Sequence, residues 1–130
     1  MAFVPYQTAD GHVPPWEYLP ASADITPKVG LLFVLSSGKL AVAGATAKPE
    51  FVCMQDRDAA VAAGTIIPVI RVTEDIIFST INSAAFTSIN IGDLVTTADG
   101  VKVTATKTNG VAEVVGFDDT AIGSEIKVKF

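Results

Sequence analysis

The sequence contains very little of what catalytic and metal sites are made from. Its 130 residues include one histidine, His12, and one cysteine, Cys53. A single imidazole cannot supply several metal ligands, and as a general base it would need a positioned partner. A single cysteine allows no disulfide within the chain, and its apolar neighbours (FVCMQ) favour a buried core residue over a reactive thiol. We therefore expect no catalytic residue, no bound metal and no cofactor.

Positive charge is also scarce. Nine Lys and Arg residues stand against fourteen Asp and Glu, which gives a net charge of −5, and the basic residues do not cluster. Nucleic-acid grooves and polybasic membrane-surface sites both need a basic patch. The sequence therefore predicts neither a nucleic-acid partner nor a membrane partner.

Long hydrophobic runs are missing as well. No apolar stretch reaches the roughly 20 residues that span a bilayer, and the N-terminus lacks the pattern of a signal peptide. We expect a soluble product made in a cytoplasm. The hydrophobic fraction of 49% is enough for a buried core, whereas the charged fraction of 18% is low. Self-association would cover part of such a weakly charged surface.

Residues 1–28 differ in character from the rest of the chain. They hold five of the seven prolines, the only Trp and both Tyr residues. Because proline fixes φ and lacks an amide donor, a stable helix or a central strand is unlikely here. Aromatic residues are unusual in disordered linkers. We therefore predict an extended, proline-rich N-terminal arm that binds a partner surface through its aromatic residues, Phe3, Tyr6, Trp16 and Tyr18.

An energy estimate indicates that this arm needs a surface to order. Burying four aromatic side chains gives about 6–12 kcal/mol. Fixing the backbone of residues 1–28 costs about 28–56 kcal/mol. The surface can belong to the same chain, to a sister subunit or to another protein. In the first case, Trp16 and Tyr18 would pack back on the body and cover an open sheet edge.

Residues 29–130 show the alternating pattern of short β-strands separated by glycine turns. Asp99-Gly100 between two alternating runs is a strong hairpin signal, and Asn109-Gly110 marks a second turn. Regularly spaced strands indicate a mostly β fold, a small β-sandwich or barrel. The predicted strands cover residues 30–35, 39–43, 51–55, 66–72, 75–81, 93–97, 101–105, 112–118 and 125–130.

Three places in this β domain leave alternatives open. Pro68 inside a strand argues for an edge strand or a bulge. Residues 56–63 fit a short helix or a loop, and residues 82–90 fit a loop or a single helical turn. The segments 82–90 and 106–110 are also the next candidates for attachment if the arm does not bind.

The acidic residues match the patterns of a calcium loop and of a catalytic carboxylate pair only in part. Asp56-x-Asp58 matches the start of a calcium loop, but Ala60 and Ile67 stand where later oxygen ligands are needed. The acidic pairs at 74–75 and 118–119 are explained by turn chemistry. They also leave open a hydrolase that cleaves glycosides with paired carboxylates, which would need two such groups converging in a cleft.

Several stretches together resemble the small head decoration (capsid cement) proteins of tailed bacteriophages. The similarity lies in their order and spacing, and it covers most of residues 29–130: VGLLFVLSSGKLAVAG (29–44), KPEFVCMQD (48–56), AGTIIPVIRVTEDIIFST (63–80), and the C-terminal IGDLVTTADGVKV, GVAEVVGFDD and GSEIKVKF. The resemblance implies a mostly β fold, a homotrimer, binding to assembled major capsid protein, a place on the capsid surface of the virion, and no catalysis.

We therefore expect a structural virion protein with an arm at 1–28 and a β domain at 29–130. The alternative from another class is a β module that binds a carbohydrate or a peptide. Exposed aromatic residues in an ordered groove of the body would favour that alternative.

Overall fold

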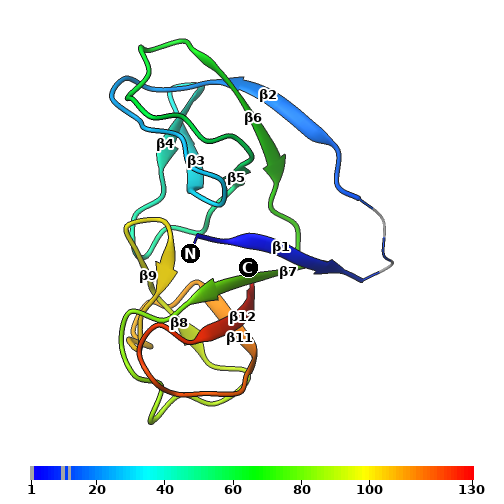
Figure 1. Ribbon diagram of the computed structural model, residues 1–130, viewed down its shortest axis with the longest axis vertical. Helices are drawn as coiled ribbons and strands as arrows, with labels where there is room; N and C mark the ends of the chain where they lie inside the picture. Colours follow the sequence, from blue (N-terminus) through cyan, green and yellow to red (C-terminus); the bar gives the residue numbers. More distant parts are fainter. Residues whose placement is uncertain (1, 10, 12) are drawn as a thin grey trace.

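The computed structural model describes residues 2–9, 11 and 13–130, and this part of the chain is all β with no helix (Figure 1). Two five-stranded antiparallel sheets pack together, and a two-stranded ribbon lies beside them. The expected mostly β fold is confirmed, and the packing is that of a small β-sandwich.

The two sheets occupy the two ends of an elongated molecule (Figure 1). Sheet I has the order β1 (Val4–Thr8), β7 (Ile76–Ile81), β12 (Glu125–Lys129), β11 (Ala112–Phe117) and β8 (Leu94–Val95). Sheet II has the order β2 (Trp16–Pro20), β6 (Ile66–Arg71), β5 (Phe51–Cys53), β3 (Leu32–Ser36) and β4 (Lys39–Val42). The ribbon is formed by β9 (Thr97–Ala98) and β10 (Lys102–Val103).

The strands of sheet II contribute to two separate cores. Alternate side chains such as Leu32, Val52 and Ile70 join Phe3, Phe78 and Phe130 in a shared core between the sheets. The intervening side chains, among them Phe33, Phe51 and Cys53, form an inner core on the other face. Ala21, Ile25 and Val61 from the loops close this inner core. Because β5 is buried on both faces, its sequence is apolar throughout, as a doubly covered strand requires.

The described part of the N-terminal segment does not form a separate arm. It supplies β1, which pairs with β7, and β2, which pairs with β6. Both are edge strands, so the expectation that the prolines exclude a central strand is confirmed. Phe3 is fully buried, and its N–H donates to the carbonyl of Gly30 at 3.0 Å. The segment therefore uses its own chain as its partner surface, because strand pairing adds hydrogen bonds and burial that aromatic contacts alone lack.

Pro68 lies in a different place from the one expected. Its strand, β6, runs between β2 and β5 with a regular register on both sides, so Pro68 is neither at an edge nor at a bulge. The N–H of Met54 donates to the carbonyl of Pro68 at 3.0 Å, but proline has no N–H to return the bond. The β5–β6 ladder ends at Cys53, next to this missing donor.

Both ambiguous segments are loops. Asp56 accepts a hydrogen bond from the N–H of Val29 at 2.9 Å, and Val61 bridges to Ile25, so residues 56–63 cover the inner core without a helix. Residues 82–90 bury Phe86 against Phe117, with the rings edge to face at 5.5 Å.

The predicted Asp99-Gly100 turn is confirmed. Both residues have positive φ, 55° and 70°, and the N–H of Val101 donates to the carbonyl of Ala98. The carbonyl of Gly100 accepts from the N–H of Leu32 at 2.9 Å. The turn therefore also ties the β9–β10 ribbon to sheet II.

Candidate attachment surface

The structure separates the four aromatic residues expected to bind a partner. Phe3 is in the shared core and is not accessible. Tyr6 lies on sheet I, 54% exposed, with the ammonium of Lys127 4.2 Å from the centre of its ring. Trp16 and Tyr18 lie together on β2 and are 49% and 64% exposed. Only this last pair belongs to one surface.

Trp16 and Tyr18 continue across β6 into a larger apolar surface. Residues directly opposite one another in paired strands share a face of the sheet. Tyr18 lies opposite Pro68, and Pro20 lies opposite Ile66, which is 51% exposed. Trp16 lies opposite Ile70, which is buried in the shared core and marks the inner end of this surface. We call these five residues the apolar strip: Trp16, Tyr18, Pro20, Ile66 and Pro68.

The opposite face of β2 carries an ion pair that joins it to β6. Glu17 accepts two hydrogen bonds from the guanidinium of Arg71, at 3.1 and 3.0 Å. The same guanidinium lies 4.8 Å from the centre of the Phe51 ring. Bidentate pairs of this kind set direction as well as distance. The aromatic rings of the strip therefore project from an ordered strand.

Sequence reasoning missed Ile66 and Pro68. The alternation within β6 places these two residues on the same face, and this could have been predicted from the sequence. Their position beside Trp16 and Tyr18 depends on the pairing of β2 with β6, whose paired residues are at least 46 positions apart in the sequence, as the register shows.

One member of each acidic pair makes a local contact. Asp75 is hydrogen-bonded to the hydroxyl of Thr73, and Asp119 accepts from the N–H of Ala121 at 3.0 Å. Asp119 lines a surface hollow with Asp118 and Glu125, and Glu125 accepts from the hydroxyl of Ser79 at 2.9 Å. Within the described ranges, no three His, Cys, Asp or Glu residues are placed to hold a metal ion. His12 lies outside the described residues.

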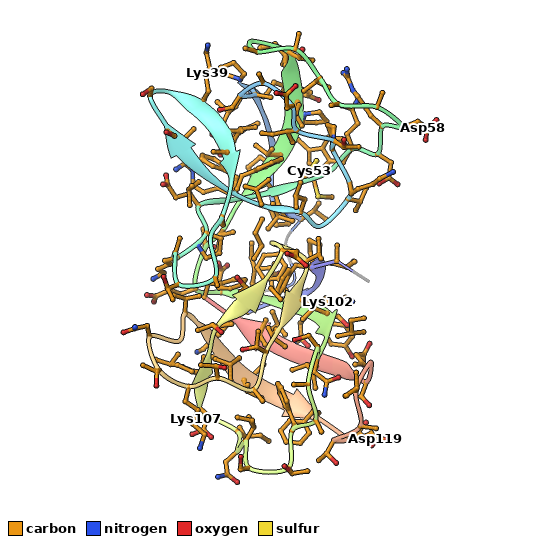
Figure 2. All side chains as sticks on the ribbon, turned by 90° about the vertical axis from the view of Figure 1, so that its left-hand side faces the viewer. Lys39, Cys53, Asp58, Lys102, Lys107 and Asp119 are labelled. Carbon is orange, nitrogen blue, oxygen red and sulfur yellow. The ribbon has the colours of Figure 1, made fainter. Side chains whose placement is uncertain are left out.

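Cys53 is a buried core residue, as expected (Figure 2). Its thiol donates to the carbonyl of Gln55, with the sulfur 3.3 Å from the oxygen. Burial raises the pKa of the thiol above its ordinary value. A raised pKa keeps the group protonated at neutral pH, which is the opposite of what a nucleophile needs.

Asp93 connects two loops at the far end of sheet I. Its carboxylate accepts from the N–H of Asn90 at 2.8 Å and lies 3.2 Å from the ammonium of Lys107. The hydrogen bond from Asn90, followed by that from Lys107, lowers the pKa of Asp93. The segments 82–90 and 106–110 are thus held to each other through one side chain.

The part of the chain that the structure describes includes no helix long and apolar enough to cross a membrane. No protein-family model and no curated protein matches this sequence.

Proposed function

We propose that this chain is a structural virion protein that binds the outside of an assembled phage capsid and stabilises it. The observation that carries the proposal is the apolar strip, in which Trp16, Tyr18 and Ile66 are about half exposed or more on an ordered sheet. The resemblance of residues 29–130 to phage head decoration proteins supplies the partner, the major capsid protein.

The strip suits attachment for physical reasons. Trp and Tyr are enriched among the residues that dominate binding energy at interfaces, because they bury a large area at a low entropy cost. Rings held on a sheet pay little additional ordering cost on binding. A self-associated form would present several strips at once, and each contact would raise the effective concentration of the next. The homotrimer implied by the resemblance is one such form.

Co-sedimentation with capsid shells tests this proposal. The shells are assembled from the major capsid protein encoded in the same genome. Wild-type protein should sediment with the shells, and Trp16→Ala should weaken its binding by at least about 2 kcal/mol, as expected for an interface hot spot. Thermal melts of each variant show whether the fold is retained.

Ile122→Ala provides the matched control. Ile122 is 70% exposed on the loop between β11 and β12, away from the strip, so its truncation should leave binding unchanged. Failure of the folded wild-type protein to bind shells would reject the function. Equal binding by wild type and Trp16→Ala would show that the attachment surface lies outside the strip.

The strip also favours a second candidate, a module that binds a carbohydrate or a peptide. Exposed aromatic residues are one part of what that function requires, and an ordered groove around them is the other. A glycan and peptide array separates the two proposals: saturable binding there, lost in Trp16→Ala, with no binding to shells, would select the second.

A further inference from the structure

The outer edge of β2 carries main-chain groups that sheet II does not use. The N–H of Ala21 donates to the carbonyl of Thr65, on the β6 side. Main-chain groups of successive residues in a strand point to opposite sides, so Glu17 and Leu19 also face β6. Trp16 and Tyr18 therefore direct their N–H and C=O groups away from the sheet, where no described residue bonds to them.

This free edge is short and bounded at both ends. Beyond Pro20, the N–H of Ser22 donates to the carbonyl of Leu40, because sheet II curls until β4 reaches β2. Pro20 itself has no N–H, and Pro14 and Pro15 precede the strand at its other end. Two donors and two acceptors remain, from Trp16 and Tyr18. Figure 1 shows β2 on the outside of sheet II, with its edge open.

We propose that this edge pairs with the same edge of a second copy of this chain, antiparallel and about a two-fold axis at Glu17. In this register Trp16 lies across from Tyr18 of the partner subunit, and Tyr18 lies across from Trp16 of the partner subunit. The two donors and two acceptors of each edge are then all used, in four hydrogen bonds.

The flanking prolines fit this register. Pro20 lies across from Pro14 of the partner subunit at each end of the pairing. Since neither proline has an N–H, the pairing ends there without leaving a donor unpaired. The segment Pro14–Pro20 is thus complementary to itself, which an isologous contact requires and a contact with an unrelated strand does not.

The side chains are compatible with the same arrangement. On one face, the rings of Trp16 and Tyr18 lie next to those of the partner subunit, and aromatic cross-strand pairs stabilise sheets. On the other face, Glu17 lies across from its own copy. The guanidinium of Arg71, 3.0 Å from Glu17, compensates the charge of each carboxylate.

Pairing through the edge does not cover the apolar strip, which lies on the exposed part of this face, whereas Ile70, opposite Trp16, is buried in the shared core. The two apolar strips become one continuous face of about twice the area, which remains available for attachment. The inference therefore goes beyond the proposed function and does not depend on capsid binding. It predicts a dimer in solution, whereas a homotrimer would need a head-to-tail contact elsewhere.

Cysteine cross-linking tests the register directly. Glu17 and its copy form a pair without mutual main-chain bonds, in which the Cα atoms are about 4.5 Å apart, within reach of a disulfide. Glu17→Cys should oxidise rapidly to a covalent dimer. Lys39→Cys, an exposed cysteine on β4 (Figure 2), should not. Cys53 is buried and does not compete.

A proline variant tests the hydrogen bonds. Tyr18→Pro removes an outward N–H but no bond to β6, and Tyr18→Val keeps the N–H while removing the ring. Light scattering should give the mass of a dimer for wild type and Tyr18→Val, and half that mass for Tyr18→Pro. Circular dichroism establishes that each variant is folded.

Three results would overturn the inference. These are a monomer or a trimer of the wild-type protein at about 100 µM, a folded Tyr18→Pro that remains dimeric, or equal cross-linking of Glu17→Cys and Lys39→Cys. If Tyr18→Pro does not fold, the cross-linking comparison decides alone. Co-sedimentation of the cross-linked dimer with shells tests the proposed function separately.

Discussion

At the scale of the residue, Gly100 meets two independent constraints. Its φ is +70°, a conformation that strains residues with a Cβ. A Cβ at this position would also lie 3.0 Å from the Cγ1 of Val42 and 3.2 Å from the Cδ1 of Leu31. The position therefore demands glycine both for the turn and for the packing of the ribbon against sheet II.

Substitutions at Gly100 should separate these two effects. Gly100→Val should destabilise the protein by more than the roughly 1–3 kcal/mol that a strained backbone alone costs. Gly100→Asn should be milder, since Asn tolerates positive φ. Gly38→Val is the control, because Gly38 has φ +77° but open space around it. Equal losses in the melting temperature for Gly100→Val and Gly38→Val would show that packing contributes nothing.

A second residue, Asp93, should make stability depend on pH. Its pKa is lowered in the folded protein, mainly by the hydrogen bond from Asn90 and then by Lys107. A lowered folded-state pKa contributes stability that is present above the unfolded value of about 3.9, and that is lost as the pH falls through the folded value.

Asp93→Asn should therefore be less stable than wild type at neutral pH, and this difference should shrink as the pH falls below about 4. Urea melts of both proteins between pH 3 and 7 measure it. Asp58→Asn, on the exposed loop at the other end of the molecule (Figure 2), is the control. A pH-independent difference at Asp93 would show that the charge is not involved.

At the scale of the element, the edge strand β1 is anchored by a buried residue that precedes it. The ring of Phe3, just before the strand, lies 5.6 Å from that of Phe130 and is fully buried. Gly30 allows this close approach, because a Cβ there would lie 2.6 Å from the main chain of Phe3. The N-terminal segment is thus locked into the shared core.

Phe3→Ala should lower the free energy of unfolding by about 3–5 kcal/mol, the range for a large buried aromatic residue. Tyr6→Ala, in the strand itself but 54% exposed, should cost much less. Chemical denaturation measures both. If Phe3→Ala lowered the free energy of unfolding as little as Tyr6→Ala does, β1 would be detached in solution and Phe3 would not stabilise the core.

At the scale of the whole molecule, the segment 1–28 takes part in both sheets and both cores. Phe3 belongs to the shared core, whereas Ala21 and Ile25 belong to the inner core. Its removal would uncover the edges of β7 and β6 and open both cores to water. A separately folding body at 29–130 is difficult to reconcile with these contacts.

Deletion of residues 1–28 should therefore abolish the cooperative thermal transition. A scan of the truncated protein by circular dichroism, with the Tyr6→Ala variant of the full chain as control, measures this. A truncated protein that melts cooperatively with a β spectrum would show that residues 29–130 fold as an independent domain.

The sequence by itself determined the local structure of this protein. Alternating apolar residues and glycine turns predicted the β class, the strands after residue 29 and the Asp99-Gly100 turn, because side-chain period and backbone φ are local properties. The one strand predicted at 93–97 is divided in the structure into β8 and β9, which belong to different sheets. The burial of Cys53 was equally readable from its apolar neighbours.

Tertiary structure alone decided which strands are neighbours. The pairing of β2 with β6 placed Ile66 and Pro68 beside Trp16 and Tyr18, and it left the β2 edge free. Tertiary structure also decided that Pro68 lies in the interior of a sheet and that Phe3 lies in the core. Strand pairing is a contact between distant segments, so its energy depends on the whole fold and leaves no signal in a local window of sequence.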